Sequence, residues 1–206
     1  MRHLALAGAL LLAVTVPALA QPDTQGFTLG LAIHSSHIGA EEESASSPAN
    51  SVFVEKNGAG VSFIIGYGFT PSFLLRFNVG VAEHDTSDPD YEFFLSSGMI
   101  EAMYLFRAGE PLRPYVQGGL GAFGMKSRQD ALDFETTGGG VVAGGGFYYF
   151  LANRFALDFG LRADFINWDE QTATLTFPND STATVETPVE GGGAAAQFHL
   201  GGSFWF

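Results

Sequence analysis

The chain has 206 residues, a formal net charge of −13 and no cysteine. This length favours a single domain, the acidic balance excludes nucleic acid as a partner, and the lack of cysteine excludes disulfide bonds. Charged residues make up only 15% of the chain, against about 25% in a typical soluble domain. We therefore expect either a membrane β-barrel, whose apolar residues are spread by alternation, or a soluble β-sandwich with a Phe-rich core.

The N-terminal segment has the features of an export signal. A short basic start is followed by an uncharged apolar run, which is too short for a membrane-spanning helix of roughly 20 residues. Ala18 and Ala20 supply the small side chains that a signal peptidase needs before its cleavage point. We predict that residues 1–20 form a cleaved signal peptide, that the mature chain begins at Gln21, and that residues 21–206 form one domain.

After this signal, apolar residues recur at every second position, which predicts β-strands whose side chains alternate between two faces. The clearest segment places Phe73, Leu75 and Phe77 on one face and Arg76 and Asn78 on the other. The pattern predicts eight strands of about 9–11 residues, the length that crosses a bilayer. They cover residues 27–34, 61–69, 73–82, 100–106, 115–123, 139–150, 155–165 and 196–206. The two Gly-rich segments, 115–123 and 139–150, do not reveal which face is which.

The predicted connections alternate between short and long. The short ones are residues 70–72, 107–113 and 151–154, and the long ones are 35–51, 84–92, 124–138 and 167–193. Short turns on the periplasmic side and long loops outside are typical of outer-membrane barrels, whereas a sandwich has no reason to alternate in this way. Within the last loop, Thr-rich residues 172–177 and 181–187 flank a Pro-Asn-Asp turn signal, which predicts a hairpin that continues the final two strands; a disordered loop is the alternative.

Three segments resemble a known family. The chain ends on Phe206, with Phe198, Leu200 and Phe204 on the same face, and this is similar to the insertion signal of outer-membrane barrels. The segments 114–121 (PYVQGGLG) and 144–154 (GGGFYYFLANR) are similar to the OmpA/OmpX-like eight-stranded family. The resemblance implies an all-β, transmembrane, antiparallel up-and-down barrel in the outer membrane, which contacts lipids and lipopolysaccharide, is inserted by the barrel-assembly machinery, is a monomer and needs no cofactor.

Charged residues on the inward faces of such a barrel are the main site candidates. A barrel of eight strands has an interior just wide enough for side chains to fill. We expect a lumen charge network, because buried charges require partners. A narrow, gated ion path is the alternative interpretation. The expected network consists of Arg76, Glu101, Asp158, Arg162, Asp164 and His199.

A second candidate is the polar run His34-Ser35-Ser36-His37 at the top of the first strand. Ser, His and an acidic residue on an outer rim would suit a lipid A-modifying enzyme, but triads are recognised by geometry rather than by adjacency. We interpret the run as polar surface and expect no enzyme and no metal site.

The long loops are strongly acidic, and the short turns carry Arg107, Arg113 and Arg154. This asymmetry predicts a non-enzymatic structural, surface-interaction or adhesion role, in which the loops bind an external ligand or divalent cations; simple solvation and a narrow porin remain alternatives. The acidic residues are Glu41, Glu42, Glu43, Glu55, Asp85, Asp88, Asp90, Glu92, Asp130, Asp133, Glu135, Asp169, Glu170, Asp180, Glu186 and Glu190. We also expect an aromatic belt at the membrane interfaces, formed by Tyr67, Phe69, Phe73, Tyr104, Phe106, Tyr149, Phe204 and Trp205.

Overall fold

The computed structural model describes residues 22–39, 54–86, 91–129, 132–177 and 181–206. The predicted signal peptide, the cleavage point before Gln21 and the acidic residues Glu41 to Glu43, Asp88, Asp90, Asp130 and Asp180 lie outside the described residues. Among the described residues, no helix is long and apolar enough to cross a membrane.

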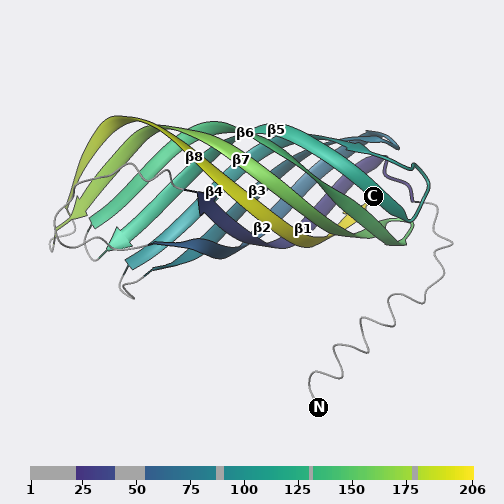
Figure 1. Ribbon diagram of the computed structural model, residues 1–206, viewed down its shortest axis with the longest axis horizontal. Coiled ribbons are helices and arrows are strands. Elements are labelled where there is room, and N and C mark those ends of the chain that lie inside the picture. The colour runs from purple at the N-terminus through teal and green to yellow at the C-terminus, as the bar shows by residue number, and fades with distance from the viewer. Residues whose placement is uncertain (1–21, 40–53, 87–90, 130–131, 178–180) are drawn as a thin grey trace, which may run out of the picture.

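Eight antiparallel strands follow one another around a closed barrel (Figure 1). They are β1 (Gly26–Gly39), β2 (Val54–Thr70), β3 (Phe73–Thr86), β4 (Tyr91–Leu105), β5 (Leu112–Gln129), β6 (Leu132–Ala152), β7 (Phe155–Thr176) and β8 (Thr182–Trp205). The last strand pairs with the first, from Thr28 opposite Trp205 to Gly39 opposite Ala194. The barrel closure and the strand order confirm the predicted fold, and the β-sandwich alternative is wrong.

The strands are longer than predicted, with 14 residues in β1 and 24 in β8 instead of 9–11. Most of the predicted loop 124–138 is strand, because β5 runs to Gln129 and β6 begins at Leu132. The predicted loops 35–51 and 84–92 likewise begin inside strands, since β1 runs to Gly39 and β3 to Thr86. The physical reason is that paired strands keep their hydrogen bonds to each other beyond the membrane. The alternating apolar residues therefore show where the strands cross the bilayer, but the strands themselves continue past that point.

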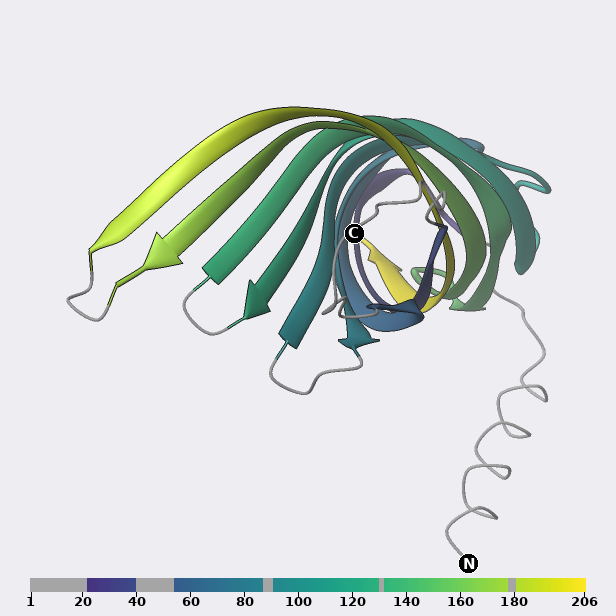
Figure 2. The same cartoon turned by 60° about the vertical axis from the view of Figure 1, so that its left-hand side comes forward.

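The predicted hairpin in the last long connection is confirmed. β7 and β8 remain paired up to Thr176 opposite Thr182, and these two strands project furthest at the long-loop end of the barrel (Figure 2, yellow-green). We call residues 124–129, 132–137, 170–177 and 181–188 the outer extension. The disordered-loop alternative is therefore wrong for the described part of this connection.

In the barrel wall, the outer face is apolar, whereas the inner face carries the polar and charged side chains together with buried apolar ones. Leu31 is 67% exposed, whereas Arg76 on the inner face is 2% exposed. The two Gly-rich strands, whose inner and outer faces the sequence did not reveal, follow the same pattern. Tyr115 and Tyr148 point inward and are buried, whereas Val116 and Leu120 point outward. The four residues of the predicted insertion signal, Phe198, Leu200, Phe204 and Phe206, all lie exposed on the outer face.

The predicted aromatic belt was wrong for one residue. Trp205 is 1% exposed and points into the barrel, between outward-facing Phe204 and Phe206. It belongs to the lumen because strand alternation places adjacent residues on opposite faces. The other belt residues that the structure describes as exposed on the outer face include Tyr67, Phe69, Phe73, Tyr104, Phe106 and Phe204.

Candidate functional site

An aromatic and aliphatic layer fills the lumen at the short-turn end. Trp205 lies at its centre, with its ring 5.2 Å from that of Phe150 and 5.3 Å from that of Tyr148. All of its members are nearly inaccessible to solvent, so this end of the lumen contains packed side chains. The layer consists of Leu74, Met103, Leu105, Tyr115, Tyr148, Phe150, Ala156 and Trp205.

Below this layer, Arg113 holds the segment that precedes β1 across the end of the barrel. Arg113 is 0% exposed. It donates hydrogen bonds to Thr24 Oγ1 at 2.8 Å and to the carbonyl of Pro71, and Thr24 also donates to that carbonyl at 2.9 Å. A Cβ at Gly68 would collide with the carbonyl of Thr24, so only glycine permits this close approach. Arg113 thus joins the N-terminal segment to the β2–β3 turn.

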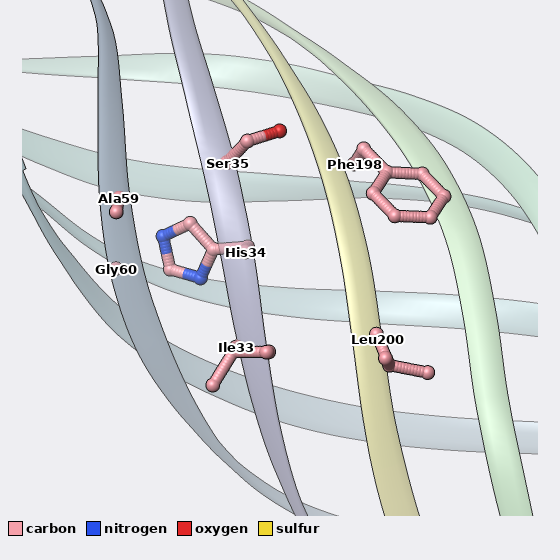
Figure 3. Close-up of a pocket in the computed structure, with 7 residues that line it drawn as sticks. All are labelled: Ile33, His34, Ser35, Ala59, Gly60, Phe198 and Leu200. Atoms are coloured by element: carbon pink, nitrogen blue, oxygen red, sulfur yellow. The ribbon is translucent and has the colours of Figure 1, made fainter. Parts of the chain in front are cut away.

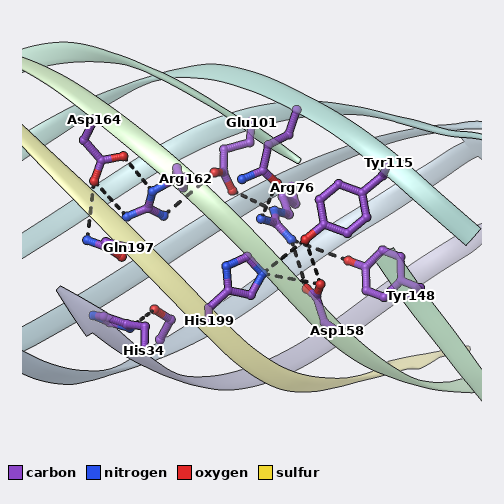
Figure 4. A network of polar contacts seen from close by, with 12 residues as sticks. His34, Arg76, Glu101, Tyr115, Tyr148, Asp158, Arg162, Asp164, Gln197 and His199 are labelled. Carbon is purple, nitrogen blue, oxygen red and sulfur yellow. Dashed lines mark hydrogen bonds and ion pairs between the residues drawn. The ribbon is translucent and has the colours of Figure 1, made fainter. Parts of the chain in front are cut away.

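Above the aromatic layer, Arg76 is the centre of a buried charge network (Figure 4). Its Nε donates to Glu101 Oε2 at 2.6 Å, and its Nη2 donates to Gln117 Oε1 at 2.7 Å. Its Nη1 lies 3.4 Å from both Asp158 Oδ2 and the Tyr148 hydroxyl. Five hydrogen-bond donors in a planar fork allow one guanidinium to satisfy several strands at once.

Asp158 connects this network to the far wall of the barrel. It accepts a hydrogen bond from the Tyr115 hydroxyl at 2.8 Å, and the Nε2 of His199 lies 3.3 Å from the same carboxylate oxygen. Tyr115 and His199 are themselves 3.2 Å apart. Asp158 therefore lies between a guanidinium, a phenol and an imidazole, which is the environment that a buried carboxylate requires.

A second cluster centres on Arg162 in β7. Its Nε donates to Asp164 Oδ1 at 2.7 Å, and Gln197 donates to Asp164 Oδ2 at 3.4 Å. Its Nη1 lies 3.9 Å from Glu101 Oε1, so this weaker ion pair links the two clusters across the lumen. The ion pairs therefore form one layer across the barrel and are not isolated contacts.

All six residues predicted for the lumen network lie in this layer. The sequence prediction missed four polar partners: Tyr115, Gln117, Tyr148 and Gln197. Three of them lie in the Gly-rich strands, where the alternation was weak. Val116 and Leu120 in β5 are exposed and apolar. Because side chains alternate along a strand, assigning these two residues to the outer face would have placed Tyr115 and Gln117 on the inner face.

A third lumen layer lies toward the long-loop end. Met99, Phe123, Val142 and Ile166 form a buried apolar cluster, and Trp168 packs against it. On the β1–β2 side, Ser62 and His34 Nδ1 are hydrogen-bonded at 3.0 Å and both residues are buried. The charged middle layer is thus flanked by packed side chains at both ends.

The run His34-Ser35-Ser36-His37 does not converge on one site, because its members alternate between the two faces of β1. His34 and Ser36 are buried in the barrel, and Ser35 and His37 are exposed on its outer side. His34 and Ser35 extend from β1 in opposite directions (Figure 3). His37 Nδ1 is hydrogen-bonded to Asn57 Oδ1 at 2.8 Å, but no hydrogen bond joins Ser35 to His37 within the described part of the chain. Beside Ser35, outward side chains border an apolar groove of about 440 Å³ that includes Phe198 and Leu200.

The structure describes several acidic residues at the long-loop end, of which Glu83 and Asp85 border the same hollow. Within the described ranges, no group of three or more His, Cys, Asp or Glu side chains is placed to hold a metal ion, and divalent-cation binding stays a prediction. Arg128 and Asp133 form an exposed pair at 2.9 Å, and the hydrogen bond from Arg128 to Asp133, together with the carboxylate's charge, raises the pKa of that guanidinium.

A comparison with protein families identifies the barrel. The sequence model of the outer membrane protein beta-barrel domain matches residues 6–186. The chain belongs to this family. No curated protein sequence matches it.

Solved structures agree with this family assignment. Neisserial surface protein A is similar over 88% of this chain and 98% of its own, with a TM-score of 0.59 at 18% identity. Ail, the attachment invasion locus protein of Yersinia pestis, is similar over 88% and 99%, with a TM-score of 0.54 at 13% identity. OprG from Pseudomonas aeruginosa is similar over 91% and 100%, with a TM-score of 0.53 at 13% identity. At these identities the likeness establishes the fold alone.

The family assignment places this barrel in the outer membrane. Its outward apolar band then faces lipid, its short turns face the periplasm and its outer extension faces the cell exterior. The long-loop end is therefore the part of the protein that can meet external partners.

Proposed function

We propose that this outer-membrane barrel is a non-conducting, non-enzymatic surface protein that binds basic partners through its outer extension. The observation that carries the proposal is the facing of this extension. Asp133, Glu135, Glu170 and Glu186 lie with Thr side chains on its convex side, outside the lipid belt. They outnumber the two cations of that side, Arg128, which pairs with Asp133, and Lys126, which lies opposite Glu135. Carboxylates spaced along a rigid, paired sheet attract a cationic surface and give it a fixed register.

The filled lumen argues against the narrow-porin alternative. A conducting path would have to pass the aromatic layer around Trp205, the ion-paired layer around Arg76 and the apolar cluster around Phe123. Each layer contains side chains that are less than about a tenth exposed, and interiors of this kind are packed at the density of organic crystals. No observation favours a channel over a closed barrel.

The structural relatives support a surface role without defining the partner. One structure of Ail holds the heparin analogue sucrose octasulfate, which is an anion. The convex face of the present barrel is acidic, so like charges would oppose an anionic ligand of that kind. We therefore propose a cationic partner for this chain.

The test compares cells that display the wild-type barrel with cells that display the triple variant Glu135→Gln, Glu170→Gln and Glu186→Gln. Polylysine-coated beads should bind the wild type more strongly, and added salt should remove the difference because exposed charges are screened. Glu110→Gln, in a periplasmic turn, is the matched control and should leave bead binding unchanged. Equal bead binding by the wild type and the triple variant would contradict the proposal.

A further inference from the structure

The outer face of the outer extension differs in chemistry from the outer face of the barrel wall. In the membrane, β6 and β8 present apolar residues outward. Above the membrane, the same strands present charged or Thr residues outward and apolar residues inward. The inward residues of the extension are Leu132, Phe134, Ala173, Leu175, Ala183 and Val185, as the strand pairing shows.

A one-residue bulge in β7 accomplishes this change for the strand at the centre of the extension. Asp169 has no partner in either ladder, because Trp168 pairs with Gly138 and Gly191 while Glu170 pairs with Thr137 and Pro188. An extra residue in one strand moves every later side chain to the other face. Gln171, Ala173 and Leu175 therefore point inward above the bulge, although it is the even-numbered residues that point inward below it.

The concave side that results contains a hollow of about 300 Å³. Three of its lining side chains are apolar: Phe93 from β4, Met125 from β5 and Phe134 from β6. The other three are neutral hydrogen-bonding groups: Ser127, Thr136 and Gln171. The Gln171 amide donates to the Thr136 hydroxyl at 3.5 Å.

This hollow lies immediately outside the lipid belt. On the outer face of the same strands, the residues change from apolar to charged at Lys126, Glu135 and Glu170, which pair with or adjoin the lining residues. Trp168 and the apolar cluster beneath it close the lumen below. A ligand in the hollow would therefore enter from the cell exterior and would not pass through the barrel.

We propose that the hollow is a binding site for an uncharged small molecule with an aromatic or aliphatic body and one hydrogen-bonding group. Three apolar side chains cover the body, and Ser127, Thr136 and Gln171 bind the polar end. None of the six lining residues is charged, so a charged ligand would lose hydration without gaining a partner. A volume of about 300 Å³ lies at the lower end of the range for small-molecule sites.

The experiment uses the absence of cysteine in the chain. Leu132→Cys, on the concave side, and Thr174→Cys, on the convex side, are each labelled with a trifluoromethyl tag in the full-length protein in lipid nanodiscs. 2-Naphthol is titrated as the uncharged probe, and naphthalene-2-sulfonate as its anionic counterpart. The ¹⁹F signal at position 132 should shift saturably with naphthol alone, and the signal at 174 should not.

Two further variants test the lining. Ser127→Leu should fill the hollow and abolish the saturable shift, whereas Phe134→Ala should weaken binding by about tenfold through lost apolar contact. Thr174→Leu on the convex side is the matched control for folding and for added bulk. A heat-dependent gel shift verifies that every variant is a folded barrel.

Three outcomes would overturn the proposal. Equal, non-saturating shifts at both tags would mean that naphthol only partitions into lipid. Saturable binding of the sulfonate with the same affinity would contradict the uncharged ligand class. No shift at position 132 would mean that the hollow does not bind the uncharged probe.

Discussion

The membrane-embedded wall and the outer extension follow the same two-residue alternation, but they place opposite chemistry on their outer faces. Inside the membrane, β8 turns Gln197 and His199 inward and Phe198 and Leu200 outward. Above it, the same strand turns Val185 inward and Glu186 outward. The difference shows that the surroundings of each region determine which side chains face outward. Lipid surrounds the membrane-embedded wall, so its polar groups must be satisfied inside, whereas water surrounds the outer extension.

The two regions also differ in how their charges contribute to stability. Arg76 and Glu101 are almost completely buried and cannot exchange their partners for water. Arg128 and Asp133 in the extension are paired at a similar distance but are exposed. Breaking a buried pair leaves an uncompensated charge, whereas water replaces the partner of an exposed one. Three substitutions and one deletion test how the two regions differ, in order of decreasing expected effect.

Arg76→Met should cause the largest loss of stability. The substitution retains side-chain volume but removes the cation that Glu101 and Asp158 share, and breaking such a buried pair costs about 3–5 kcal/mol. Urea unfolding of the barrel in lipid vesicles measures this loss. The double variant Arg76→Met with Glu101→Leu should be less destabilised than the single variant, because it removes one of the carboxylates left behind. A double variant that unfolds more easily than the single one would contradict the network.

Arg113→Ala should have the next largest effect. It leaves the carbonyl of Pro71 and the hydroxyl of Thr24 with fewer partners beneath the aromatic layer, at a cost of about 1–3 kcal/mol. Protease added from the periplasmic side should cleave the segment before β1 in this variant and not in the wild type. Arg107→Ala in the neighbouring exposed turn is the control and should resist cleavage as the wild type does.

Deletion of Asp169 together with Glu170 should change the outer extension and leave the membrane barrel intact. Gln171 would then follow inward-facing Trp168 directly, so Thr172 and Thr174 would point inward, Leu175 would point outward and the apolar concave side would be lost. Amide hydrogen exchange should increase in residues 170–176 and 182–188 and stay unchanged in residues 155–165. Asp169→Ala keeps the extra residue and should exchange as the wild type does, and increased exchange across the whole chain would refute the local role of the bulge.

Arg128→Ala should have no measurable effect on unfolding in urea. The side chain and its partner Asp133 are exposed, and water and salt ions substitute for such a partner. A loss comparable to that of Arg76→Met would mean that the extension is as tightly coupled to the barrel as the lumen is.

The membrane part of the fold could be predicted from the sequence because its alternation is strict. Phe73 to Val81 and Phe155 to Phe165 each define an outward face unambiguously, and the inward positions that follow, such as Arg76 and Asp158, are the network that the structure contains. The lengths of the connections also predicted the barrel topology, since the connections 70–72 and 151–154 are too short to be anything but hairpin turns.

The outer extension was harder to predict for a physical reason. Its strands are amphipathic with Thr and Glu against Leu, Phe and Val, so residues 124–138 have no apolar belt and resemble a polar loop. The bulge at Asp169 adds one residue that breaks the alternation of β7 at the membrane boundary. In β5 and β6, Gly lines both faces, which concealed the inward positions of Tyr115 and Tyr148.

Single-channel recording of the purified barrel in planar lipid bilayers tests the central claim most directly, because that claim is a lumen closed by three layers of side chains. We predict no discrete conductance steps for the wild type under an applied voltage, and the same for Thr174→Leu. Steady, reproducible channel openings of the wild type, altered by Arg76→Met, would contradict the closed lumen and favour the narrow-porin function.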